Sequence, residues 1–317
     1  ALLKTDPESS VYQLYVANSL NNIGTVLYDM GRLEEAKDKY KRALDMREAL
    51  FQTDPENSVF QLDVANSLNN IGLLLNDMGR LEEAKNKYER ALDMREALFQ
   101  TDPENSVYQS DVAATLNNIG ILLNDMGRLE EAKNKYERAL DLYEAFLQTD
   151  PESSVYQSDI AMTLNNIGKL LNDMGRLEEA KDKYERALDL YEALLKTDPE
   201  NSVYQSAVAM TLNNIGKLLN DMGRLEEAKD KYERALDMRE ALLQTDPENS
   251  VYQSAVAIAL TNIGILLNDM GRLEEAKNKY EKVLKFQKFF LKDNPTNENY
   301  LEWNQVTIEK FEILKNK

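Results

Sequence analysis

The sequence contains no histidine and no cysteine among its 317 residues. Without histidine there is no imidazole to act as a general base in a catalytic triad, and none to bind zinc. Without cysteine no disulfide can form, and the redox compartment cannot be inferred. Glycine-rich phosphate loops and calcium-binding loops are also missing. The sequence therefore predicts a protein that is not an enzyme and that needs no cofactor or metal ion.

Basic residues are outnumbered, with 38 Lys and Arg against 56 Asp and Glu, for a net charge of −18 at pH 7. No basic stripe is present that could replace the counterions of a phosphate backbone, so nucleic acid is disfavoured as a partner. Acidity also disfavours an anionic membrane surface, and the sequence has no run of eighteen apolar residues and no signal peptide. We therefore expect a cytoplasmic protein whose charge keeps it soluble.

Proline and glycine are few, and all of them lie on a regular lattice. The seven prolines recur every 48 residues, at Pro7, Pro55, Pro103, Pro151, Pro199, Pro247 and Pro295. The twelve glycines form pairs seven residues apart, such as Gly72 and Gly79. The stretch LNNIGKLLNDMGRLEEA at 164–180 has near copies that begin at Leu20, Leu68, Leu116, Leu212 and Leu260. This periodicity predicts one repeat array without a linker or second domain.

The 48-residue unit from 54 to 101 is typical of two helices. Asp54 is expected to cap the first helix and Pro55 to occupy its first position. One apolar stripe follows at helical spacing: Val64, Leu68, Ile71 and Leu75. Gly79 can adopt the left-handed conformation that ends a helix. The second helix carries its own stripe: Leu81, Ala84, Tyr88, Ala91 and Leu98. Neither helix can bury its stripe alone, so stacked hairpins are predicted.

These residues resemble the tetratricopeptide repeat (TPR) signature, in which small residues such as Gly72, Ala84 and Ala91 allow close helix packing. Leu68 stands where the family usually has tryptophan, and the period is 48 rather than 34 residues. Seven extra residues per helix add about two turns without changing the face that it presents. The repeats are most similar to those of the kinesin light chain type. The resemblance implies an all-α, right-handed superhelical solenoid of antiparallel helix hairpins that binds proteins.

Three segments are expected along the chain. Residues 1–9 are the end of a truncated upstream repeat, because ALLKTDPE at the start recurs at 193–200. Residues 10–292 are six TPR-like repeats of 48 residues. Residues 293–317 are a C-terminal capping helix in which Val306 and Phe311 would cover the last hairpin; the alternative is a separate docking helix.

Variation among the six copies is concentrated on one face of the first helices, at the positions of Tyr15, Asn18 and Thr25 in the first repeat. The residue at the centre of this face never varies, and it is asparagine in every repeat: Asn22, Asn70, Asn118, Asn166, Asn214 and Asn262. In TPR proteins this face lines a concave groove that binds ligands, and the resemblance implies the same role here. A carboxamide can pair with both the N–H and the C=O of a passing peptide. The alternative is a structural row in which each asparagine braces the neighbouring helix.

Two further pairs on this face are candidates for reading the side chains of a partner. Met162 and Met210 form an apolar patch suited to adaptable recognition. Lys169 and Lys217 could hold an acidic residue or simply be solvated. On the second helix another position varies between arginine and tyrosine, and we expect it to serve inter-repeat packing: Arg47, Arg95, Tyr143, Tyr191 and Arg239.

The sequence thus predicts a protein–protein interaction scaffold that binds an extended or helical peptide segment. One alternative is a structural spacer that self-associates end to end. Another is the sensor arm of a larger signalling protein.

Overall fold

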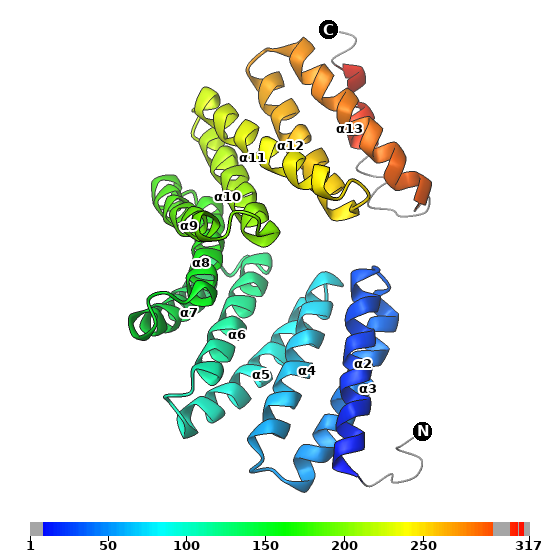
Figure 1. Ribbon diagram of the computed structural model, residues 1–317, viewed down its shortest axis with the longest axis vertical. Helices are drawn as coiled ribbons and strands as arrows, with labels where there is room; N and C mark the ends of the chain where they lie inside the picture. The colour runs from blue at the N-terminus through cyan, green and yellow to red at the C-terminus, as the bar shows by residue number, and fades with distance from the viewer. Residues whose placement is uncertain (1–8, 294–304, 310, 314–317) are drawn as a thin grey trace. The chain divides into compact units, whose positions relative to one another are not determined.

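The computed structural model describes residues 9–293, 305–309 and 311–313, and every regular element in that part of the chain is a helix (Figure 1). The predicted upstream segment 1–9 lies outside these residues except for Ser9. First and second helices of the repeats alternate along the chain: α2 (Ser10–Asp29), α3 (Leu33–Thr53), α4 (Ser58–Asp77), α5 (Leu81–Thr101), α6 (Ser106–Asp125), α7 (Leu129–Thr149), α8 (Ser154–Asp173), α9 (Leu177–Thr197), α10 (Ser202–Asp221), α11 (Leu225–Thr245), α12 (Ser250–Asp269) and α13 (Leu273–Asp293).

The chain divides into two compact units, one that ends at Tyr156 and one that begins at Gln157. In unit 1 the hairpins are α2–α3, α4–α5 and α6–α7; α3 also packs against α4, and α5 packs against α6. In unit 2 the hairpins α10–α11 and α12–α13 pack in the same sequential manner, with α9 against α10. The predicted all-α array of paired helices is therefore confirmed.

The first helices begin three residues later than predicted. Asp54 follows the last residue of α3, and Pro55 lies in the turn between α3 and α4. The cap of α4 is Asn57, whose Oδ1 accepts hydrogen bonds from the backbone N–H groups of Val59 and Phe60. The prediction of an Asp54 cap with Pro55 in the first helical position was therefore wrong. The physical reason is that only the Asn57 side chain can reach the free N–H groups of the first turn.

The first helices end as predicted. Gly79 has a φ of 70° and ends α4, with its N–H donating to the Asn76 carbonyl at 2.9 Å. The next N–H, that of Arg80, donates to the Leu75 carbonyl at 2.8 Å. This pair of bonds satisfies two carbonyls that would otherwise be free at the helix terminus.

The core lies where the apolar stripes of paired helices meet, and its closest contact is between a glycine and a tyrosine. A Cβ added to Gly72 of α4 would lie 2.8 Å from Cδ1 of Tyr88 in α5. Tyr88, Ala84 and Ala91 are buried, as predicted for the small-residue packing sites. The same approach of glycine to tyrosine recurs in every repeat, which keeps both helices of each hairpin in one fixed register.

Beyond α13, residues 305–309 form a short helical segment that packs against it. The Gln287 side chain of α13 donates to the Thr307 hydroxyl at 2.9 Å, and both groups are buried. Val306, which was expected to cover the last hairpin, is exposed, so that expectation was wrong for this residue. Because the segment places Thr307 inward, its neighbour Val306 must face away from α13.

Helix α12 is the one described helix that is long and apolar enough to cross a membrane. It lies between α11 and α13 and packs against both. Its buried side chains include Val256, Leu260 and Ile263. This packing accounts for its apolar composition, which is expected of a core helix in a repeat array.

Candidate interaction face on the first helices

One face of each first helix carries the side chains that the sequence marked as variable, together with the invariant asparagines. We call it the first-helix face, defined by the positions of Val11, Tyr15, Asn18, Asn22 and Thr25 in each repeat. These positions are three or four residues apart and so lie on one side of the helix. In unit 2 the face is exposed at several large side chains. Met162 is 40% exposed, Met210 42% and Ile258 45%.

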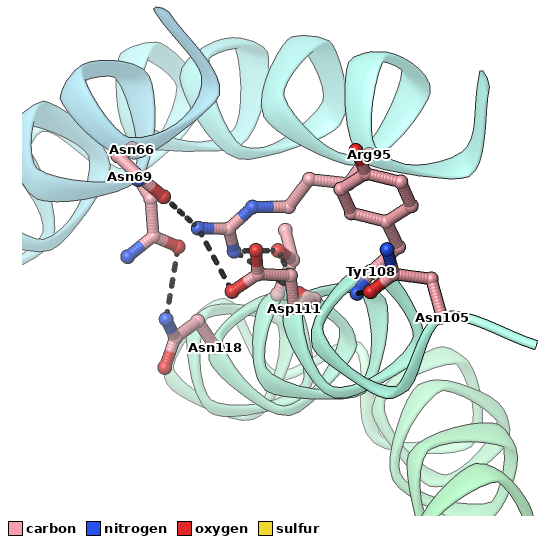
Figure 2. Close-up of polar contacts among 8 residues, drawn as sticks. Asn66, Asn69, Arg95, Asn105, Tyr108, Asp111 and Asn118 are labelled. Carbon is pink, nitrogen blue, oxygen red and sulfur yellow. Dashed lines mark hydrogen bonds and ion pairs between the residues drawn. The ribbon is translucent and has the colours of Figure 1, made fainter. Parts of the chain in front are cut away.

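The asparagine row is partly exposed and also bonds across repeats. Asn70 Nδ2 donates to Asn21 Oδ1 at 3.0 Å, and Asn118 Nδ2 donates to Asn69 Oδ1 at 3.0 Å (Figure 2). In unit 2 the same bond joins Asn262 to Asn213 at 2.7 Å. The predicted bracing role therefore exists in these repeats, through side chains rather than the backbone. Each amide uses one N–H in this way, which leaves its second N–H and its oxygen for other partners.

Asn214 differs from these three members of the row. The acceptor equivalent to Asn21 and Asn69 is Asn165, whose Nδ2 donates to the Thr211 hydroxyl at 2.8 Å and whose Oδ1 is buried without a hydrogen-bond partner among the described residues. In the part of the chain that the structure describes, the Asn214 side chain makes no hydrogen bond, and it is partly exposed. Its whole carboxamide is therefore available to a ligand.

Two buried arginines connect the second helices to the first-helix face in unit 1. Arg95 of α5 donates through Nη1 to the Asp111 carbonyl at 3.0 Å and to the Thr115 hydroxyl (Figure 2). Its Nη2 donates to Asn66 Oδ1 at 2.5 Å and lies 3.7 Å from Asp111 Oδ1. Burial raises the pKa of the Asp111 carboxyl, and the positive charge of Arg95 opposes that rise. Arg47 makes the same set of contacts one repeat earlier.

This network shows that Arg47 and Arg95 serve inter-repeat packing, as expected for their position. It also shows something that the sequence reasoning missed, because the arginines bind residues of the variable face itself. Asn18, Asp63, Asn66 and Asp111 were identified only as variable positions. Part of the signal was present in the sequence, since Arg47 and Arg95 each have an aspartate 16 residues later and an asparagine 29 residues earlier.

A second missed feature is a row of exposed valines at the start of each first helix. Every repeat has one, and all are more than half exposed: Val11, Val59, Val107, Val155, Val203 and Val251. They precede the position of Tyr15 by four residues and thus extend the first-helix face toward the helix N-terminus. A search for variation could not find them because they are identical in all repeats.

The two predicted lysines also lie on this face. Lys169 and Lys217 are both exposed, two turns beyond Met162 and Met210 on the same helices. Within the described residues no group of acidic side chains is arranged to hold a metal ion. In unit 2 the first-helix face thus combines exposed apolar side chains, amides and positive charge.

Comparison with protein families gives matches to tetratricopeptide repeat models over much of the chain. One model matches residues 159–241 and 207–288, and a second matches 16–56, 64–104 and 112–151. The chain belongs to the tetratricopeptide repeat family. TPR domains are in general protein-interaction modules, and neither match identifies a catalytic domain. A comparison with curated proteins found no match.

Solved structures share the TPR fold at low sequence identity. BtubC (BKLC) from P. vanneervenii is 19% identical with a TM-score of 0.62, over 81% of this chain and 92% of that one. RapI in its apo form is 15% identical with a TM-score of 0.51, over 95% of this chain and 99% of that one. A putative kinesin light chain from Podosopora anserina with nearly identical TPR-like repeats is 15% identical with a TM-score of 0.47, over 70% of this chain and 94% of that one. The predicted resemblance to tetratricopeptide repeat proteins is confirmed by the family matches, and BtubC (BKLC) shares the fold.

Proposed function

We propose that the first-helix face of unit 2 binds an extended or helical peptide segment of a partner protein. The observation that carries this proposal is the row of exposed apolar side chains on three successive first helices, Met162, Met210 and Ile258. Large apolar side chains that gather on a surface mark interaction sites, whereas single ones are common on any protein. The exposed valines Val203 and Val251 extend the same row.

The chemistry of this face suits a peptide. Methionine side chains are flexible and polarizable, so they adapt to apolar side chains of different shape. The unbonded carboxamide of Asn214 can pair with a peptide main chain through one acceptor and two donors. Neighbouring first helices lie roughly 10 Å apart, and an extended peptide rises about 3.3 Å per residue. One amide therefore meets about every third peptide residue, and Lys169 and Lys217 offer positive charge for an acidic side chain.

Unit 1 presents a different face. At the positions of Met162 and Met210 it carries Asn18, Asn66 and Ala114. The asparagine oxygens accept hydrogen bonds from Arg47 and Arg95, so part of the polar chemistry of this face is satisfied within the protein. Tyr15 and Leu73 are exposed on this face of unit 1, but they stand at different positions of their repeats, whereas Met162, Met210 and Ile258 occupy one position on successive first helices; for this reason we assign apolar recognition to unit 2.

End-to-end self-association is the weaker alternative. It would need the outward side of α13 to receive the first helix of another copy. The segment 305–309 already packs there. Its Thr307 accepts a hydrogen bond from Gln287, which lies 20 residues earlier, just as Ser67 of a first helix accepts one from Arg47, 20 residues earlier. This segment therefore occupies the place of the next first helix.

The test is a selection of peptides from a random library on the whole chain, followed by affinity measurements with two doubly substituted variants. M210E/I258E places two carboxylates on the proposed face. The matched control A241E/Q244E adds the same charge at exposed positions of α11. We expect M210E/I258E to weaken the selected peptides at least tenfold and the control to leave their affinity unchanged. Equal affinity for both variants would rule out this face as the binding site.

A further inference from the structure

Arg239 of α11 occupies the position in its repeat that Arg47 and Arg95 occupy in theirs. In unit 1 both terminal amino groups of each of these arginines have acceptors, while the buried Nε has none within the described part of the chain. Arg95 has the Asp111 carbonyl and carboxylate, the Thr115 hydroxyl and the Asn66 amide oxygen. Each acceptor stands at a fixed offset from the arginine, so the equivalent residues around Arg239 can be compared one by one.

Three side-chain acceptors are missing around Arg239. Ala255 stands in the place of Asp111, Ala259 in the place of Thr115, and Met210 in the place of Asn66. Arg239 keeps a single hydrogen bond, from Nη1 to the Ala255 carbonyl at 2.9 Å. Among the described residues no carboxylate lies within 4.0 Å of its guanidinium. The repeat has therefore retained the cation and lost its counter-charge.

Arg239 is also the most exposed residue of the three. Arg47 and Arg95 are buried, whereas Arg239 is partly exposed. Burial lowers the pKa of Arg239, but a guanidinium remains charged at neutral pH. Ala255 is partly exposed, and Met210 and Ile258 are exposed on the same side of unit 2. Because alanine lacks the carboxylate of aspartate, Ala255 places no side-chain oxygen beside Arg239 where Asp111 places one beside Arg95.

We propose that Arg239 receives the side-chain carboxylate of an Asp or Glu residue in the bound peptide, which takes the place that the Asp111 carboxylate has beside Arg95. This inference rests on the proposed function, since it names one residue class in the ligand of the same face. A planar guanidinium binds a carboxylate with two parallel hydrogen bonds, and in a partly desolvated site this pairing is strong. Met210 and Ile258 then receive the apolar side chains that flank the acidic residue.

The test uses peptides selected from a random library on the wild-type chain, each compared with versions in which one acidic residue is changed to its amide. For one acidic position we expect this change to weaken binding to the wild-type chain at least tenfold, as a charge-assisted hydrogen bond implies. The same change should have little effect on binding to R239Q. The change from acid to amide in the peptide should also have little effect on binding to A255D, because the new aspartate supplies an internal carboxylate in the place of the peptide carboxylate.

The A255D variant keeps the test valid if R239Q folds poorly. A255D restores the pairing seen at Arg95, so its thermal unfolding midpoint should rise above that of the wild-type chain. The matched control is R95Q. In the wild-type chain Arg95 is already paired with Asp111, so the R95Q variant should still bind the acidic peptide more tightly than its amide version. A C-terminal carboxylate as the true ligand would show as a loss of binding on amidation of the peptide terminus, and it would overturn the side-chain assignment.

Failure of this inference is distinguishable from failure of the proposed function. If no acidic position matters, or if it matters equally in R239Q, then Arg239 is not the receptor. Should M210E/I258E still abolish binding of those peptides, the face remains the binding site. If M210E/I258E has no effect either, both proposals are wrong.

Discussion

The guanidinium of Arg95 in α5 lies 3.7 Å from the carboxylate of Asp111 in the next repeat, and its Nη1 donates to the Asp111 main-chain carbonyl at 3.0 Å. This relationship joins the packing of two hairpins to the surface of the first-helix face. It also divides the repeats into those where the charge pair is complete and those where one or both partners have been replaced.

The complete pair predicts that neutralising its acid destabilises the fold. D111N leaves the buried Arg95 without a counter-charge, which costs about 3–5 kcal/mol in a buried pair. Because the substitution also relieves the burial that raises the pKa of Asp111, we expect a net loss of about 1–2 kcal/mol in the free energy of unfolding. Urea denaturation of the variant measures this loss. D93N, at an exposed position of α5, is the control and should change stability by less than about 0.5 kcal/mol. Equal effects of the two substitutions would contradict a stabilising role for the pair.

The equivalent aspartate in α8 predicts the opposite sign. Burial raises the pKa of Asp159 to about 6, and no charged partner opposes the rise. Between its ordinary pKa of about 4 and this value, the folded state binds more protons than the unfolded state. This contribution therefore lowers stability as the pH rises from about 4 to 6. D159N should remove the penalty and stabilise the chain by about 1–2 kcal/mol at pH 7, with no gain below about pH 4.

The pH dependence of Asp159 is measured as the difference in denaturation midpoint between wild type and D159N across this range. The many other carboxylates titrate in both proteins and cancel in the difference. A gain that is independent of pH would show that ionisation of Asp159 is not the cause.

The contact between glycine and tyrosine predicts a steric cost. A Cβ added to Gly216 of α10 would lie 2.8 Å from the ring of Tyr232 in α11. Alanine is the better helix former by about 1 kcal/mol, but overpacking at this distance costs about 1–3 kcal/mol. We expect G216A to be destabilising on balance, and to be less so in a Y232A background, where the ring is absent. A double-mutant cycle by denaturation measures this coupling, and strict additivity would refute it.

The observed start of α10 predicts that Asn201, and not Asp198, is the residue of the DPEN turn that caps the helix. N201A removes the oxygen that accepts from the N–H groups of Val203 and Tyr204. Its expected cost is about 1 kcal/mol. Asp198 contacts only Asn201 in that turn, so D198A should cost clearly less. The comparison of the two denaturation midpoints decides between them, and a larger loss for D198A would restore the aspartate cap.

Much of the fold follows from the sequence because its determinants are local and repeated. The apolar stripe from Val64 to Leu75 and the left-handed Gly79 specify a helix and its end without knowledge of the partner helix. The cap was mispredicted because Asp54 and Asn57 are both capping residues three positions apart, and only the backbone geometry decides between them. The Arg95 network could not be predicted because its partners lie 16, 20 and 29 residues away, on helices whose packing brings them together.

The central claim is that a peptide binds along the first-helix face of unit 2, and methionine-methyl NMR tests it most directly. The chain has eleven methionines, of which Met162 and Met210 lie on that face while Met222 and Met238 do not. We predict that titration with a selected peptide shifts the methyl signals of Met162 and Met210 and leaves those of Met222 and Met238 in place. Shifts confined to Met222, Met238 or the methionines of unit 1 would contradict the account.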